Sequence, residues 1–241
     1  MWRYMQKTSG KGVIYMVPLP VADDANHTLS PDVLRHTAEL RHYFVENART
    51  ARRFLRSLHQ SLVLEEIQFS EIDKHAGADT QLLKKWLAEG RSVGVMSEAG
   101  CPGVADPGSV VAMLAHEMGA KVIPLTGPSS ILLALMASGL NGQSFAFHGY
   151  LPVKEPARGK RIKELEAISQ KERQTQIFIE TPYRNSQMMT DLVKNCHPRT
   201  KICMAMDISG PAERIETKTA AEWKVQLPDY EKKPAVFLLL G

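Results

Sequence analysis

The chain has 241 residues, of which 44% are hydrophobic and 23% charged, and its formal net charge is +4; these values are ordinary for a soluble globular protein. The small positive charge permits an anionic partner but does not by itself argue for one. The chain has three cysteines without CxxC spacing, which argues against a disulfide framework and a metal site. It shows no apolar leader and no apolar run of the roughly 20 residues that span a bilayer. We therefore predict a cytoplasmic protein that does not contact a membrane.

Apolar runs alternate with amphipathic stretches through the first half of the chain. Ser30, followed by Pro31, is a good start for a helix. Asp79 caps a later helix that stops at Gly90. Strands are expected at residues 12–17, 42–46, 92–96 and 121–125, with a further apolar segment at 62–69 and a basic helix at 50–59. This β-α-β-α order predicts a mainly parallel sheet with helices on both faces.

The second half of the chain has a different pattern. Strand-like runs lie at residues 144–148, 175–180, 201–207 and 235–240, and helices are expected at 158–171, at 182–196 and near Ala220. We predict an α/β fold of two α/β domains with about five strands each. Residues 1–125 form the N-terminal α/β domain with a mainly parallel sheet, and residues 126–241 form the C-terminal α/β domain with a mixed sheet.

Two loops rich in small residues follow strands of the first half. The first contains Gly100, Gly103 and Gly108, and the second is Thr126-Gly127-Pro128-Ser129-Ser130. Loops at the carboxyl edge of a parallel sheet form ligand crevices, and glycine lets the main chain approach a ligand closely. The second loop lies at the expected domain boundary, so we predict a cofactor cleft between the domains. Asp106, before Pro107, is expected to cap the helix that follows.

Several common catalytic motifs are missing from the sequence. The first strand is followed by VPLPVADDANHTLSP and not by GxGxxG, and the chain contains no P-loop, HExxH or GxSxG pattern. These absences lower the expectation of a dehydrogenase, kinase, metalloprotease or hydrolase.

Four segments carry a resemblance to a known family. They are SEAGCPGVADPG, VIPLTGPSSILLALMASGL, FAFHGYLPVK and FIETPYR, in this order. Together they resemble the tetrapyrrole-methylase superfamily, and within it the branch of small-subunit ribosomal RNA cytidine-2′-O-methyltransferases. That branch carries SDAGTPLISDPG, PLPGPSA, a GFLPRK-like segment and ESPHR at the equivalent places, and AEDTR where this chain has Val45-Glu46-Asn47-Ala48-Arg49.

The resemblance implies a homodimeric enzyme that binds S-adenosyl-L-methionine (SAM) and acts on RNA. At Cys101 the wider superfamily has an aspartate, which puts a carboxylate contact with the cofactor in doubt at that position. The residues that the resemblance assigns to cofactor binding are Leu19, Ser97, Gly100, Cys101, Val104, Ser129, Ser130, Ile179, Glu180, Met206, Pro234 and Ala235.

The resemblance also suggests residues for catalysis and for the substrate. Glu46 matches a glutamate at a strand end, where a carboxylate could orient a ribose hydroxyl or accept its proton, although helix capping or an ion pair with Arg49 explains it equally well. Glu46 and Arg49 are therefore the candidate catalytic residues. Lys154, Arg158 and Arg184 are candidate substrate-binding residues because cations neutralise RNA phosphates.

The sequence leaves three functions open. The first is 2′-O-methylation of ribosomal RNA, and the second is methylation of a precorrin-like tetrapyrrole. The third is a catalytically inactive paralogue that binds the cofactor or RNA, because Glu46-Asn47-Ala48 replaces the branch's EDT and the loop after the first strand is altered.

Overall fold

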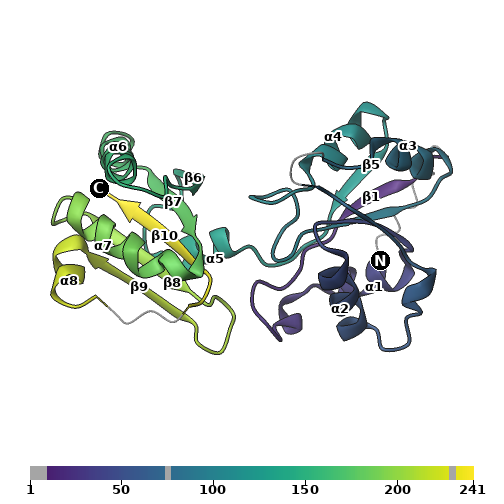
Figure 1. The fold of residues 1–241 in the computed structure, drawn as a ribbon, viewed down its shortest axis with the longest axis horizontal. Coiled ribbons are helices and arrows are strands. Elements are labelled where there is room, and N and C mark those ends of the chain that lie inside the picture. Colours follow the sequence, from purple (N-terminus) through teal and green to yellow (C-terminus); the bar gives the residue numbers. More distant parts are fainter. Residues whose placement is uncertain (1–9, 74–76, 228–231) are drawn as a thin grey trace. The chain divides into compact units, whose positions relative to one another are not determined.

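The computed structural model describes residues 10–73, 77–227 and 232–241. The chain divides into two compact units, residues 1–128 and 129–241, and each is described by itself (Figure 1). The domain boundary that the sequence predicts, between residues 125 and 126, concerns which parts of the chain fold independently, and it stays a prediction. No described helix has both the length and the apolar composition needed to cross a membrane.

The N-terminal unit contains a five-stranded sheet in the order β3-β2-β4-β1-β5. Every strand pair in it is parallel, which confirms the predicted type of sheet. The strands are β1 (Val13–Met16), β2 (His42–Val45), β3 (Gln68–Glu71), β4 (Val93–Met96) and β5 (Lys121–Pro124). The apolar segment at residues 62–69 supplies only the start of β3, because a 3₁₀ turn, η2 (Leu64–Glu66), occupies its middle.

Helices cover both faces of this sheet, as the alternating pattern predicted. They are α1 (Pro31–Glu39), α2 (Ala48–Leu58), α3 (Thr80–Ala88) and α4 (Ser109–Glu117), and a 3₁₀ turn, η1 (Asn26–Thr28), precedes α1. Tyr43 packs with residues of α1 and α2, whereas its neighbour Phe44 packs with residues of α3 and α4. Successive residues of a strand point to opposite faces, so the sheet is buried on both sides.

Of the two aspartates predicted from the sequence to cap helices, Asp79 caps its helix and Asp106 does not. Asp79 accepts a hydrogen bond from the backbone N–H of Leu82 and caps α3. The cap of α4 is Gly108, with φ +133°, and not Asp106 as expected. The helix starts two residues after Pro107, so the side chain of Asp106 comes too early in the chain to act as its cap.

The C-terminal unit contains a mixed sheet in the order β6-β7-β10-β8-β9. Strands β6 and β7 are parallel, and the other pairs are antiparallel. The strands are β6 (Phe145–Tyr150), β7 (Thr175–Glu180), β8 (Lys201–Met206), β9 (Arg214–Thr219) and β10 (Ala235–Leu240). β9 was not among the strands predicted from the sequence. One parallel and one mixed sheet, both packed with helices, confirm the predicted α/β class.

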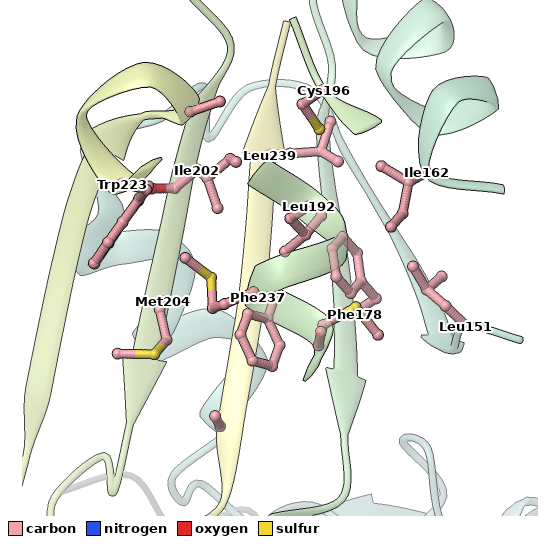
Figure 2. Packing of buried hydrophobic residues seen from close by; sticks show 14 of the residues in the cluster. Leu151, Ile162, Phe178, Leu192, Cys196, Ile202, Met204, Trp223, Phe237 and Leu239 are labelled. Carbon is pink, nitrogen blue, oxygen red and sulfur yellow. The ribbon is translucent and has the colours of Figure 1, made fainter. Parts of the chain in front are cut away.

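The helices of this unit are α5 (Ser130–Ser138), α6 (Ala157–Glu172), α7 (Asn185–Asn195) and α8 (Ala220–Val225), with a 3₁₀ turn, η3 (Pro182–Arg184). Figure 2 shows Phe178, Phe237, Met204 and Trp223 in one cluster with residues of α6 and α7. The buried indole N–H of Trp223 donates to the carbonyl of Ile202 at 2.9 Å. Helix α5 packs on β8, β9 and β10.

Candidate functional site

The loop of residues 97–108 follows β4 at the carboxyl edge of the N-terminal sheet. Its Gly100 and Gly103 adopt φ values of +65° and +81°, which glycine accepts without strain. Gly100 forms a two-bond bridge with Leu19 of the loop after β1. The N–H of Leu19 donates to Gly100 at 2.9 Å, and the N–H of Gly100 donates back at 3.1 Å. These backbone groups therefore fix two neighbouring loops to one another.

Three other predicted cofactor residues lie in the same loop. Ser97 is buried and donates its hydroxyl to the carbonyl of Ala99 at 3.0 Å. The thiol of Cys101 lies 3.4 Å from the carbonyl oxygen of Pro128, and burial raises its pKa, so it is protonated at neutral pH. Val104 is 48% exposed and offers an apolar surface to solvent.

Glu46 follows the last residue of β2 and is linked to this loop. Its Oε2 accepts a hydrogen bond from the backbone N–H of Glu98 at 3.2 Å. The capping role is taken by Asn47, whose side chain accepts from the N–H groups of Arg49 and Thr50 at 2.9 and 3.1 Å. Asn47, and not Glu46, is therefore the residue whose side chain caps α2. Glu98 was not among the residues predicted from the sequence, although it lies directly after Ser97.

Arg49 is the first of several exposed arginines on α2. They are spaced three and four residues apart, which places them on neighbouring positions of the helix surface. These residues are Arg49, Arg52, Arg53 and Arg56. The guanidinium of Arg52 lies over the ring of Phe69, 5.0 Å from its centre. All four are exposed, and none of them forms an ion pair with a residue in the described ranges.

The second small-residue loop leads into α5. A Cβ on Gly127 would lie 2.2 Å from Cγ of Pro18, so only glycine fits there without a shift of the chain. Ser129 is the cap residue of α5, but its hydroxyl makes no capping hydrogen bond, and Ser130 is the first helical residue. The N–H groups of a helix's first turn lack partners within the helix and favour an anion.

The predicted cofactor-binding residues of the C-terminal unit lie at one end of the neighbouring strands β7, β10 and β8. Ala235, at the start of β10, is paired with Glu180 at the end of β7 and with Met206 at the end of β8. All three residues are buried. Ile179 is paired with Val236, one position further along, and the exposed Pro234 precedes the row.

Glu180 has an ion-pair partner inside this unit. Its Oε1 accepts from Nη2 of Arg184 at 2.7 Å and from the N–H of Thr181 at 2.7 Å. Burial alone would raise the pKa of Glu180, but the hydrogen bonds from Arg184 and Thr181 outweigh it and lower the pKa. Its other oxygen, Oε2, is buried and has no hydrogen-bond partner. Such an oxygen is costly unless a ligand or water pairs with it.

Arg184 is therefore only partly available to a substrate, because it pairs with Glu180 and its guanidinium lies 5.0 Å from the centre of the Tyr183 ring. Lys154, after β6, is exposed and accessible.

The structure gives no support to the prediction that Arg158 binds substrate. Arg158 is 4% exposed, forms an ion pair with the buried Asp191 of α7, and donates to the carbonyl of Val153 at 2.8 Å. A phosphate could reach it only after a buried ion pair is broken, which is costly.

The sequence matches the family model described as Tetrapyrrole (Corrin/Porphyrin) Methylases over residues 21–224. A curated relative from Vibrio cholerae serotype O1, named Ribosomal RNA small subunit methyltransferase I, is 30% identical over 97% of this chain and 78% of its own length. A relative of the same name from Escherichia coli O157:H7 is 28% identical, over 100% of this chain and 82% of its own length.

Solved structures show the same fold at lower identity. A diphthine synthase has a TM-score of 0.64 at 15% identity, with 95% of this chain and 90% of that chain covered. A uroporphyrin-III C-methyltransferase from Thermus thermophilus, complexed with S-adenyl homocysteine, has a TM-score of 0.53 at 18% identity, covering 95% and 97% of the two chains.

Proposed function

The chain belongs to the tetrapyrrole methylase family, and we propose that it is a SAM-dependent methyltransferase that methylates a ribose 2′-hydroxyl of small-subunit ribosomal RNA. The observation that carries this proposal is the match to the Vibrio cholerae relative over 97% of the chain, because that relative is named for this RNA. The match does not favour a precorrin-like substrate. An inactive paralogue is the outcome that the experiment below would reveal.

Two groups of residues would supply contacts with SAM. In the N-terminal unit they are the loop of residues 97–104 and Leu19, where Gly100 and Gly103 place no side chain between the main chain and a ligand. In the C-terminal unit they are the row of Glu180, Ala235 and Met206. The unpartnered Oε2 of Glu180 fits the polar hydroxyl or amino groups of an adenosine, which would satisfy it. The free N–H groups at the start of α5, next to Ser129 and Ser130, suit the carboxylate of the methionine part.

When bound, SAM supplies an electrophilic methyl group, and the protein supplies binding and orientation. Holding the acceptor oxygen in line can lower the barrier by on the order of 7–11 kcal/mol in favourable cases. A ribose hydroxyl is a weak nucleophile until it loses its proton. Glu46, fixed at the carboxyl end of β2 by the N–H of Glu98, is our candidate to orient that hydroxyl and accept its proton.

The RNA would meet the exposed arginines of α2 and the side chain of Lys154. Exposed cations neutralise phosphates and release counterions, so binding should weaken steeply with salt. Arg49, next to Glu46 in sequence and first on α2, would bind a phosphate beside the reacting ribose. We also propose a homodimer that works in the cytoplasm, where ribosomal subunits are found. Light scattering of the purified protein tests the dimer.

The central experiment supplies the purified protein with methyl-labelled SAM and small ribosomal subunits from cells that lack it. We expect label in the RNA as an alkali-resistant dinucleotide, the signature of a methylated 2′-hydroxyl, and none with Glu46→Gln at matched concentration. Bare RNA and a porphyrinoid are parallel substrates. Label in the porphyrinoid alone would replace the proposal with tetrapyrrole methylation. Label in no substrate, despite SAM binding by calorimetry, would identify an inactive paralogue.

A further inference from the structure

Two tyrosines of the C-terminal unit are exposed where strands β6 and β7 end. Tyr150 is the last residue of β6 and is 58% exposed. Tyr183 lies in the turn η3, which follows β7, and is 68% exposed. Tyrosine rings carry a large apolar area that folding usually buries. Two rings left open to solvent at neighbouring strand ends therefore suggest a binding surface.

Arg184 is a neighbour of both tyrosines. Tyr150 is paired with Ile179 of β7, and the next residue, Glu180, forms the ion pair with Arg184. The guanidinium of Arg184 lies 5.0 Å from the centre of the Tyr183 ring, and its Nη1 donates to the Tyr183 hydroxyl at 3.1 Å. The hydrogen bond to Glu180 raises the pKa of Arg184 most, and both tyrosines add to this, so both lie near the guanidinium.

These contacts fix the ring of Tyr183 without covering it. Arg184 is itself held by Oε1 of Glu180, 2.7 Å from its Nη2, and it touches both the hydroxyl and the ring of Tyr183. The ring is still 68% exposed, so the guanidinium covers only part of it. A side chain that is already held in place loses less entropy when a ligand binds to it.

Unpaired bases of RNA are the ligand that this chemistry fits best. Bases that are not in a helix stack on tyrosine rings and on guanidinium planes, and stacking accepts any base because each has a π face. Lys154, four residues after Tyr150, is exposed and supplies a cation for the phosphate backbone. An RNA duplex keeps its base faces inside the helix, so it would not meet the rings.

We propose that Tyr150 and Tyr183 form a stacking platform for unpaired bases of the RNA substrate, with Lys154 on an adjoining phosphate. The inference rests on the proposed function, in which the substrate is RNA, and adds two substrate-binding residues to it. It also gives the C-terminal unit a direct contact with bases, in addition to the phosphate contacts of α2.

The test measures the Kd of the full chain for two labelled single strands by fluorescence anisotropy. One is a short oligoadenylate, and the other is an abasic strand with the same number of phosphates. We expect the wild type to bind oligoadenylate about tenfold more tightly than the abasic strand. Tyr150→Leu should lose most of this preference, and Tyr150→Phe should keep it, because only phenylalanine retains an aromatic face.

Two further variants separate stacking from charge and from apolar area. Lys154→Ala should weaken both strands alike and make the salt dependence of Kd shallower, whereas the Tyr150 variants should leave that slope unchanged. Val225→Ala removes apolar area from an exposed side chain of α8 in the same unit and should change neither quantity. Tyr183→Leu should also reduce the preference for bases. It removes a hydrogen bond of Arg184 as well, so Tyr150 is the decisive position.

Equal binding of the two strands by the wild type, or no binding of either, would overturn the inference. An unchanged preference in Tyr150→Leu would do so too, and would assign the position to an apolar contact such as a protein partner. The Kd for SAM in calorimetry and the melting temperature of Tyr150→Leu should match the wild-type values. A weaker Kd for SAM with unaltered RNA binding would assign Tyr150 to the cofactor instead.

None of these measurements requires methyl transfer, so the inference and the proposed function can fail separately. A wild type that prefers oligoadenylate to the abasic strand but methylates no RNA contradicts only the proposed function. A wild type that methylates ribosomal RNA but binds both strands equally contradicts only the stacking platform.

Discussion

Nη2 of Arg184 lies 2.7 Å from Oε1 of Glu180, and the side chain of Glu180 is only 1% exposed. The pair holds the buried carboxylate at the end of β7 in its ionised form. Because the folded state lowers the pKa of Glu180 below its ordinary value of 4.5, the unfolded state binds more protons as the pH falls. This contribution to stability is complete above pH 4.5 and is lost as the pH falls through the lowered pKa. Arg184→Ala should destabilise the protein by about 1–3 kcal/mol at neutral pH, since it leaves the carboxylate unpaired. Urea unfolding between pH 3 and pH 7 measures both effects.

Glu180→Gln is the matched variant for that pH dependence. It keeps the shape of the side chain but cannot ionise, so its stability should fall less steeply below pH 4.5 than that of the wild type. Parallel curves for the two proteins would show that the ion pair does not couple to folding.

The buried pair of Arg158 and Asp191 gives a second prediction, which also tests whether Arg158 binds substrate. Arg158→Ala should lower the free energy of unfolding by about 3–5 kcal/mol, because it leaves a buried charge without a partner. The double variant Arg158→Met/Asp191→Leu should recover much of that loss and keep the wild-type KM for RNA. A folded double variant with a greatly raised KM would support Arg158 as a substrate residue.

Gly127 and Gly142 form a contrasting pair of glycines. An alanine Cβ at Gly127 would meet Pro18 at 2.2 Å, whereas one at Gly142 would have no atom within 4 Å. Gly127→Ala should destabilise the protein by about 1–3 kcal/mol through overpacking. Gly142→Ala should be neutral or stabilise it by up to roughly 1 kcal/mol, since it restricts the unfolded chain. Thermal melting of both variants decides this, and similar melting temperatures would mean that the loop at Gly127 relaxes freely.

The arginines of α2 predict a defined dependence on salt. Arg49→Ala/Arg56→Ala spares Arg52, which packs on Phe69, and Arg53, which lines a pocket together with Leu19 and Glu98. The slope of log Kd for RNA against log salt should become shallower by roughly 0.7–0.9 for each phosphate contact removed. Lys84→Ala on α3 is the control and should leave the slope unchanged. An unaltered slope in the double variant would exclude α2 from the RNA surface.

Substitutions in the small-residue loops test the cofactor residues. Gly100→Val adds a branched side chain where φ is +65°, and Ser129→Tyr places a ring at the start of α5. We expect both to abolish SAM binding in calorimetry. Because valine at Gly100 is strained and can unfold the loop, Ser129→Tyr is the decisive variant. Ser186→Tyr, at an exposed position of α7, is its control. Wild-type affinity in Ser129→Tyr would show that the site has been misplaced.

Hydrophobic periodicity predicted most of the strands, but it could not find β9. In the segment RIETKT the alternate residues Arg214, Glu216 and Lys218 are charged, and Glu216 pairs with both cations across one face. β9 is an edge strand, and charged side chains are common there because they discourage pairing of the free backbone groups with another chain. The period of two in its charges was the available signal.

The candidate site shows a similar limit. Loops and strand ends could be placed from local sequence, and Glu180, Ala235 and Met206 do share one row. The burial of Arg158 could not be foreseen, because it depends on Asp191 on another helix. Local charge pattern describes a residue's chemistry, whereas tertiary packing decides which groups remain open to a substrate.

The bridge between Leu19 and Gly100 is made only of peptide groups. Replacement of the leucine side chain leaves both of these hydrogen bonds possible, so the link between the two loops does not depend on the type of side chain at position 19. Proline at position 100 is different, because it removes a donor and cannot adopt the required φ. The link between these loops therefore depends on the backbone conformation at Gly100 and not on any side-chain hydrogen bond.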